Sequence, residues 1–455
     1  MQLRNYIDKG IIPTNVQDKD AEGAMTQKII FPGALIIYQG EEYVLNFLKQ
    51  SQAERNLNNS IQALEYEFVN KIYKAIEKKR KKIAFIDGHG ELGIPETRDI
   101  MISLSEYYDV KRVIINHQLR ALNDYEAIVI AKPDSTFDEK DKFVIDQFLM
   151  NGGKILWLID AVNSNLDSLA KKNFTIALPY KDLNLNDILF KYGVRINNDL
   201  IQDLQSSVIP VNVSLNKSKP QWRAMPWLYF PLLNSENQHT ITKYVNMVKS
   251  EFISSIDTVG GNPEINKKIL LSSSKYSKII NTPVSISLDI LKERINQKKF
   301  NKSNIPVAVL LEGKFESVFK NRIPKNILKN KDINFIEKSK KTSQIVVSDG
   351  DIIKNIVKIS KNGNLQSLPL GTDRYYEHAF TKGNTEFILN AINYLCDDSG
   401  LMSVRTREIT LRMLDKEKIK KEKLKWQIIN VISPLIFVVV FGISLFFIKK
   451  NFYKK

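Results

Sequence analysis

The distribution of hydrophobic residues along this chain sets apart one uninterrupted apolar stretch near its carboxyl end. Residues 428–448 read IINVISPLIFVVVFGISLFFI, contain no ionisable side chain, and are followed at once by Lys449 and Lys450. About twenty apolar residues in a helix, at about 1.5 Å per residue, cross a hydrocarbon core about 30 Å thick. We therefore expect residues 428–448 to form a transmembrane helix, followed by a basic tail at 449–455.

Short apolar runs that alternate with amphipathic segments dominate the middle of the chain. Apolar runs of strand length occur at residues 83–88, 127–133 and 154–160, and each ends in turn-forming or polar residues. Helical segments of about ten to fifteen residues separate such runs, which is typical of parallel strands joined by right-handed crossovers. Strands of the same kind return at KILLSSS, VAVLLEG and QIVVSDGD. This pattern predicts an α/β fold with a doubly wound, mostly parallel sheet.

Residues 1–80 are expected to form a partial α/β unit of their own. The segment KIIFPGALIIYQGEEYVLNFL predicts two strands around a turn at Gln39 and Gly40. A helix is then expected to begin at Asn59, because Gln62 completes a pattern like a capping box. The apolar stripe of this predicted helix consists of Ile61, Leu64, Phe68, Ile72 and Ile76.

Three local signals lie within the predicted body, residues 81–400. Thr136 and Glu139 form a capping-box pattern ahead of the helix DEKDKFVIDQFLMN. The proline-flanked stretch KPQWRAMPWLYFPLLN is expected to be an ordered loop or an edge strand, because proline cannot donate a ladder hydrogen bond. The segment NTEFILNAINYLCDD predicts a helix with one apolar face that also buries Cys396. Residues 401–427 then form a charged connector to the apolar stretch.

Charge and composition exclude several classes of function. The 455 residues carry a formal net charge of +17, but the lysines are spread through nearly every segment, so we expect no nucleic-acid partner. A single cysteine excludes an intrachain disulfide and a zinc site built on paired cysteines. The glycines of GHGELG are not spaced as in dinucleotide or phosphate loops, and the chain has no G-x-S-x-G elbow. We expect no cofactor and no catalytic activity.

Two groups of polar residues follow predicted strands and form the candidate site for a ligand or partner. Asp87, His89 and Glu91 lie in DGHGELG, and Asp349 and Asp351 lie in SDGD. Ligands of doubly wound folds bind at the carboxyl ends of strands, where such side chains act as metal ligands or proton carriers. A structural turn, an ion or ligand site and a catalytic site are all open interpretations of the first group. For the second group, a solvated turn with an Asx cap stands beside a metal site.

The other three histidines do not form a recognisable motif in the sequence. His117, His239 and His378 stand apart in the sequence, and we expect each to be a surface or capping residue. No second histidine or carboxylate pair can be identified from the sequence as completing a site with His89.

Six segments, taken together and in order, resemble the GldG family, the gliding-motility-associated auxiliary components of ABC transporters in Bacteroidota. The segments are LNNSIQALEYEFVNKIYKAI, KKIAFIDGHGEL, NGGKILWLIDAV, ILFKYGVRINNDLIQDL, QIVVSDGDIIKN and GNTEFILNAINYLCDDSGLMSVRTREITLRMLDKEK. The resemblance covers nearly the whole chain. It implies a glutamine-amidotransferase-like α/β fold without known catalysis, a body on the periplasmic side of the inner membrane, and separate permease and ATPase partners.

The resemblance also bears on topology and on rival functions. Family members carry an N-terminal membrane helix, and this chain begins at what resembles the later part of that region, so a first anchor upstream of Met1 is expected. Basic residues flank 428–448 on both sides, and the positive-inside rule alone does not fix the orientation. The expected function is a non-catalytic, membrane-anchored accessory component of an ABC-type system. The alternatives are an envelope solute-binding receptor that uses the strand ends near Asp87 and Asp349, and a membrane-bound hydrolase.

Overall fold

The computed structural model of the chain divides it into two units, Met1–Arg407 and Glu408–Lys455. The residues that the structure describes are 2–19, 25–48, 55–76, 80–164, 166, 168–169, 174–180, 182–214, 219–235, 239–243, 245–323, 333–360, 362–372, 382–400, 402 and 416–452. His378 and most of the predicted connector therefore lie outside the described residues.

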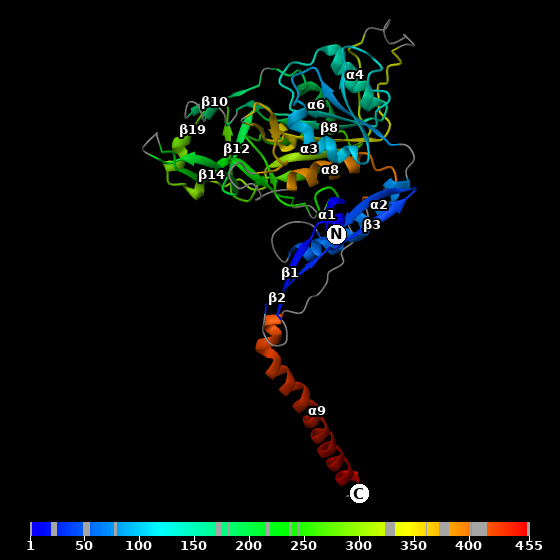
Figure 1. The fold of residues 1–455 in the computed structure, drawn as a ribbon, viewed down its shortest axis with the longest axis vertical. Helices are drawn as coiled ribbons and strands as arrows, with labels where there is room; N and C mark the ends of the chain where they lie inside the picture. The colour runs from blue at the N-terminus through cyan, green and yellow to red at the C-terminus, as the bar shows by residue number, and fades with distance from the viewer. Residues whose placement is uncertain are drawn as a thin grey trace. The chain divides into compact units, whose positions relative to one another are not determined.

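A seven-stranded sheet forms the centre of the first unit, in the order β17-β20-β21-β8-β7-β5-β6. Strand β8 of this sheet is labelled in Figure 1. The strands from β21 to β6 run parallel, and β20 and β17 extend the sheet in antiparallel fashion. The bounds are β5 (Lys82–Asp87), β6 (Asp109–Ile114), β7 (Ala127–Ala131), β8 (Lys154–Leu158), β17 (Ile265–Ser272), β20 (Pro306–Gly313) and β21 (Thr342–Val347). The predicted mixed α/β architecture with a mostly parallel sheet is confirmed.

Helices cover both faces of this sheet. Successive side chains of a strand point to opposite faces, and Ile83 and Phe85 accordingly pack in a different core from Ala84 and Ile86. The first core includes buried residues of α3 and α8, and the second includes those of α4 and α6. The bounds are α3 (Ile94–Ser105), α4 (Glu139–Met150), α6 (Asn186–Tyr192) and α8 (Gly383–Leu395). The sheet is therefore doubly wound, as the alternation of strands and helices predicted.

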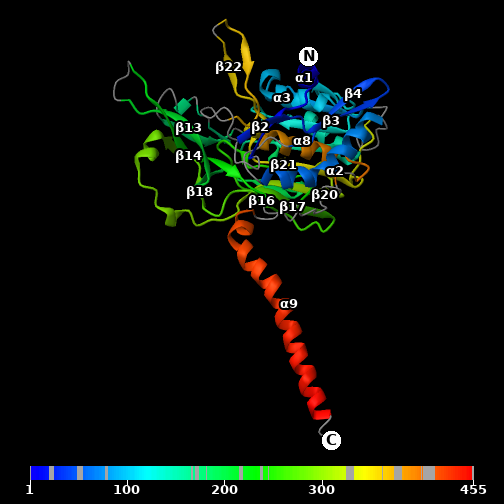
Figure 2. The ribbon, with the colours of Figure 1, turned by 60° about the horizontal axis from the view of Figure 1, so that its bottom comes forward.

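Short antiparallel sheets lie between β8 and β20 in the sequence, and several of their strands contribute to a third hydrophobic core. Their strands are β9 (Val162–Asn163), β10 (Phe174–Pro179), β11 (Val194–Ile196), β12 (Asp199–Asp203), β13 (Ser206–Asn212), β14 (Trp222–Leu233), β15 (Val248–Lys249), β16 (Ile256–Thr258), β18 (Ser277–Asn281) and β19 (Val284–Ser287). A hairpin of β22 (Val357–Ile359) and β23 (Leu365–Ser367) projects from the body, as Figure 2 shows at the label β22. Three 3₁₀ turns are η1 (Leu288–Lys292), η2 (Gln297–Lys299) and η3 (Gly350–Ile353).

The prediction of an ordered loop or an edge strand for the proline-rich stretch is wrong in part: β14 is a strand that lies between β13 and β15, but β15 pairs only with Leu232 and Leu233 at its end. Its two prolines lie at an interruption of the ladder: Pro226 pairs with Val208 and Pro231 with Ser206, and the register shifts between these pairs. A proline without an N–H is tolerated where such a bulge removes the need for a donor. The residues between the prolines are buried, including Trp227 in the third core.

The N-terminal region confirms one local prediction and corrects another. Its elements are α1 (Gln2–Asp8), β1 (Thr14–Lys19), β2 (Met25–Ile30), β3 (Gly33–Tyr38), β4 (Glu41–Asn46) and α2 (Arg55–Ile76). The hairpin of β3 and β4 turns at Gln39 and Gly40, both with positive φ, as expected for a tight hairpin turn.

The predicted buried stripe of α2 is wrong in part. Phe68 and Ile76 of that stripe are exposed, whereas Ser60, Tyr66 and Asn70 are buried. Helix α2 begins at Arg55, before the predicted capping pattern. Contacts with the body set the buried face: the Tyr66 hydroxyl donates a 2.8 Å hydrogen bond to Met402 Sδ. The apolar period alone did not reveal this face, because Ser60 and Asn70, two of the buried residues among the α2 side chains that the structure describes, are polar.

The start of α4 also differs from the prediction. Asp138, not Thr136, caps the helix, and its Oδ1 accepts hydrogen bonds from the backbone N–H groups of Lys140 (2.9 Å) and Asp141 (2.8 Å). Aspartate at this position satisfies two N–H groups that have no partner within the helix. The Thr136 hydroxyl instead donates to the Asp182 carbonyl. In α8 the predicted apolar face is buried, and so is Cys396.

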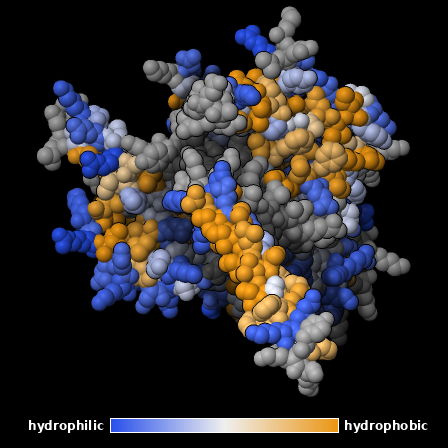
Figure 3. All heavy atoms as spheres, turned by 90° about the horizontal axis from the view of Figure 1, so that it is seen from below, coloured by the Kyte–Doolittle hydropathy of each residue, from blue (hydrophilic) through white to orange (hydrophobic). Residues whose placement is uncertain are grey.

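The second unit contains a single long helix, α9 (Lys416–Phe452), with Pro434 in its interior. Residues Lys421–Lys450 of this helix have a mean hydropathy of 2.8 over their most apolar window, and none of that window is buried. Figure 3 shows this hydrophobic surface as a continuous column that ends in hydrophilic residues. By length and composition, α9 is able to cross a membrane.

Candidate functional site

The carboxyl ends of three neighbouring parallel strands bring four charged side chains together. Lys132 follows β7 directly, Asp160 lies two residues after β8, and Asp349 and Asp351 follow β21. Parallel strands end at the same edge of a sheet, which is where doubly wound folds bind ligands. We call Lys132, Asp160, Asp349 and Asp351 the lysine–aspartate cluster.

The Lys132 ammonium lies between two carboxylates of this cluster. Its Nζ is 2.9 Å from Asp160 Oδ2 and also forms an ion pair with Asp351 Oδ2. The side chains of Lys132, Asp160 and Asp351 are 14%, 9% and 9% exposed. Because these side chains are buried, the fold is stable only if their opposite charges are paired, since an unpaired charge in the interior is strongly destabilising. The cluster therefore holds the ends of β7, β8 and β21 together.

The Asx cap predicted for SDGD is confirmed, but the turn is not solvated. Asp349 Oδ1 accepts a 2.7 Å hydrogen bond from the Asp351 N–H, and Oδ2 accepts one of 2.8 Å from the Glu251 N–H. Asp349 is fully buried. The sequence did not show this burial because the covering residue Glu251 lies about a hundred positions away.

Electrostatics within the lysine–aspartate cluster follow from burial and pairing. Burial acts to lower the pKa of Lys132, but the carboxylates of Asp160 and Asp351 outweigh it and hold that pKa well above its usual value. Burial raises the pKa of Asp349, and repulsion from Asp351 and Asp160 raises it further. For Asp351, burial is outweighed by Lys132 and Lys354, which lower its pKa. The three carboxylates are close enough for a metal ion, but Lys132 already supplies the compensating cation.

Gly350 allows Lys132 to approach the η3 turn. A Cβ atom at Gly350 would lie 2.3 Å from the Lys132 Cβ. We expect Gly350→Ala to destabilise the protein by about 1–3 kcal/mol, because this overlap forces the backbone apart. The thermal unfolding midpoint of the full chain in detergent, followed by tryptophan fluorescence, measures the effect. Gly261→Ala is the matched control, since no atom lies within 4 Å of a Cβ there. Equal midpoints for the two variants would contradict the expected close contact.

The structure does not bring Asp87 together with His89. The Asp87 carboxylate forms an ion pair with Arg112 of β6, with a distance of 2.7 Å between Nε and Oδ2. The side chains of His89 and Glu91 instead turn into the body, where that of Glu91 is fully buried and that of His89 is 8% exposed. The His89 ring stacks on Phe137 at a centroid distance of 3.7 Å.

His89 lies between two carboxylates. Its Nδ1 is 3.4 Å from Glu91 Oε1, and its Nε2 is 3.2 Å from Asp141 Oδ2 of α4. Glu91 Oε2 also accepts a 2.7 Å hydrogen bond from the His89 backbone N–H. Burial acts to lower the pKa of His89, but Glu91 and Asp141 outweigh it, so the pKa is raised. This arrangement favours an imidazolium that bridges the turn after β5 and the first turn of α4.

Sequence reasoning missed Lys132, Asp160 and Asp141. Lys132 and Asp160 stand at strand ends, in AIVIAKP and KILWLID, which was a usable signal. Lys132 also adopts a positive φ of 53°, which is uncommon for a residue other than glycine. Asp141 gave no signal, because an aspartate in the first turn of a helix is ordinarily a solvated residue that favours the helix dipole.

The chain is thus a doubly wound α/β protein with polar clusters at one edge of its sheet, and it also carries a long apolar helix. Residues 80–391 match a family described as an ABC-type uncharacterized transport system. The chain belongs to this family, and it is therefore an auxiliary component of an ABC-type transport system. The resemblance noted from the sequence is confirmed at this family level.

A comparison with curated proteins gave no match. Among solved structures, the N-terminal domain of mmIFT52 is 14% identical, with a TM-score of 0.38 over 73% of this chain and 100% of that one. The exo-β-1,4-mannosidase Op5Man5 from Opitutaceae bacterium strain TAV5 is 10% identical, with a TM-score of 0.23 over 67% of this chain and 36% of that one. Scores this low support no argument about the function of this chain.

Proposed function

We propose that this chain is a non-catalytic accessory subunit of an ABC-type transport system associated with gliding motility, as in the GldG family. It works with a permease and an ATPase encoded as separate chains. Helix α9 anchors it in the inner membrane through residues 428–448, and the body at 81–400, with a glutamine-amidotransferase-like fold, faces the periplasm. The observation that carries this proposal is the family match over residues 80–391, which spans most of the doubly wound body.

The lysine–aspartate cluster supports the non-catalytic part of the proposal. Ligands of doubly wound folds bind at this sheet edge, yet here Lys132 is saturated by Asp160 and Asp351. A lysine base or nucleophile needs a lowered pKa, whereas the two carboxylates raise that of Lys132. The cluster thus stabilises the fold by joining three strand ends. The body itself serves as a docking surface for the other subunits of the transport system.

Copurification tests the proposal. The affinity-tagged full chain, expressed with the permease and ATPase of the same organism and solubilised in mild detergent, is expected to retain both subunits at a fixed ratio. A tagged membrane protein of similar size from the same cells controls for nonspecific association. In the native host, deletion of the gene is expected to abolish spreading on agar, and the full chain restores it. A chain that purifies alone and whose loss leaves spreading intact would refute the proposed role.

A further inference from the structure

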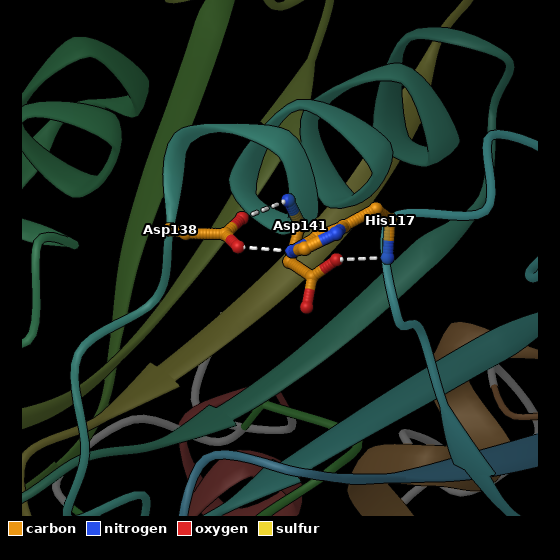
Figure 4. Close-up of side chains that lie close together, drawn as sticks. All are labelled: His117, Asp138 and Asp141. Carbon is orange, nitrogen blue, oxygen red and sulfur yellow. Dashed lines mark hydrogen bonds and ion pairs between the residues drawn. The ribbon is translucent and has the colours of Figure 1, made fainter.

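Three side chains with metal-ligating atoms converge where β6 ends and α4 begins (Figure 4). One ligand atom from each of His117, Asp138 and Asp141 lies within 4.8 Å of the other two. The His117 N–H donates a 2.7 Å hydrogen bond to Asp141 Oδ1, and its Nε2 contacts Asp138 Oδ2. Two of the three side chains are accessible from solvent, since His117 is 45% and Asp138 50% exposed, while that of Asp141 is 8% exposed.

Behind this group lies a second layer formed by His89 and Glu91. Asp141 Oδ2, the oxygen that does not accept from His117, is 3.2 Å from His89 Nε2. On the far side of the ring, His89 Nδ1 and Glu91 Oε1 are 3.4 Å apart, and neither atom makes a hydrogen bond to any residue that the structure describes. Outer carboxylate and histidine partners of this kind orient the ligands of metal sites.

The side chains around His117, Asp138 and Asp141 carry more negative than positive charge, which favours binding of a cation. Asp138, Asp141 and Glu91 contribute carboxylates, and the buried ring of His89 offsets one of them. Lys142 of α4 does not neutralise the group, because its Nζ pairs with Glu139 at 2.9 Å and Asp187 at 3.1 Å. In the lysine–aspartate cluster, by contrast, an ammonium already lies between the carboxylates.

We propose that His117, Asp138 and Asp141 bind one divalent transition-metal ion, and that His89 and Glu91 are positioning residues for Asp141. One imidazole nitrogen with two carboxylates suits Zn²⁺ or a similar ion better than Mg²⁺ or Ca²⁺, which prefer oxygen ligands alone. The ion takes the place of the direct contact between His117 Nε2 and Asp138 Oδ2. Asp138 Oδ1 remains the helix cap, and Oδ2 faces the ion. Three protein ligands and an exposed side leave a position for water.

Zinc binding to the full chain in detergent, measured by isothermal titration calorimetry with ZnCl₂, tests the site. We expect one site per chain and at least about tenfold weaker binding in His117→Asn, which removes the imidazole. Asparagine is chosen because His117 has a φ of 61°, a conformation that asparagine tolerates. His239→Asn is the matched control, since His239 packs against Tyr394 outside this group, and it should leave affinity unchanged.

Glu91→Gln tests the second layer. We expect about 10–100-fold weaker Zn²⁺ binding and altered visible absorption of the Co²⁺-loaded chain, because Asp141 loses its orientation. A purely structural role for Glu91 would lower the unfolding midpoint without changing the Co²⁺ spectrum. Unchanged zinc affinity in His117→Asn would overturn the proposal and identify surface binding elsewhere. Absence of binding to the unmodified chain at micromolar Zn²⁺, or equal affinity for Mg²⁺, would overturn it as well.

Discussion

Replacement of Lys132 by methionine is expected to lower the free energy of unfolding by about 3–5 kcal/mol, because it leaves Asp160 and Asp351 buried without their cation. Methionine keeps most of the aliphatic length of lysine and has the same difficulty with a positive φ, so the change isolates the charge. The unfolding midpoint of the full chain in detergent, in increasing urea, measures the loss. Lys111→Met is the matched control, since its side chain is 55% exposed and its ion pair with Asp109 contributes at most about 1 kcal/mol.

The loss of unfolding free energy caused by Lys132→Met should become smaller as the pH falls. In the unmodified chain the pKa of Asp351 is lowered, so its contribution is present above the pKa of the unfolded chain and is lost as pH falls through the folded value. In the variant, burial without the ammonium raises the pKa of both carboxyls. The penalty for burying their charges then disappears as the pH falls and they become protonated. A deficit that stays constant from pH 7 to pH 4 would show that lost packing, not charge, destabilises the variant.

Removal of residues 428–455 is expected to move the protein from the membrane pellet to the supernatant. This deletion takes away the apolar part of α9, which by composition is able to span a bilayer. Ultracentrifugation after alkaline carbonate extraction, followed by immunoblotting, measures the distribution. The full chain, extracted in parallel, should remain in the pellet.

A second control separates an anchor from surface attachment. Deletion of the basic tail alone, residues 449–455, keeps the apolar stretch 428–448 and should leave the protein in the pellet. A form lacking 428–455 that remains in the pellet after carbonate would contradict α9 as the anchor. Release of that form by high salt would then point to electrostatic attachment of the strongly basic chain, which salt screens.

The central strands could be predicted because they are buried on both faces. IAFID, AIVIA and KILWL read as continuous apolar runs, and no polar period obscures them. The predictions were wrong where contacts with residues distant in the sequence determine which face of an element is buried or where a strand lies in its sheet. The buried face of α2 depends on contact with Met402, and the position of β14 depends on strands on both sides.

The candidate sites were predictable only in part, for a related reason. Asp349, Asp351 and His89 were found because they follow recognisable strands. The side chains that pair with them were not predicted, because these pairings depend on the order of strands across the sheet, which no local sequence pattern indicates. Asp351 meets Lys132 only because β21 inserts beside β8. His89 meets Asp141 because α4 begins over the end of β5, and the helix pattern places Asp141 without indicating which strand it faces.

The parallel pairing of β8 with β21 also governs how this chain folds as it is made. Gln344 pairs with Ile155, and the ribosome synthesises residues 159–341 between the two strands. During that interval β8, whose residues are mostly buried in the finished fold, presents an unpaired apolar edge. Such edges pair readily with other strands, so the unfinished sheet is prone to association until β21 emerges. Completion of the sheet therefore falls late in translation, shortly before α9 itself leaves the ribosome.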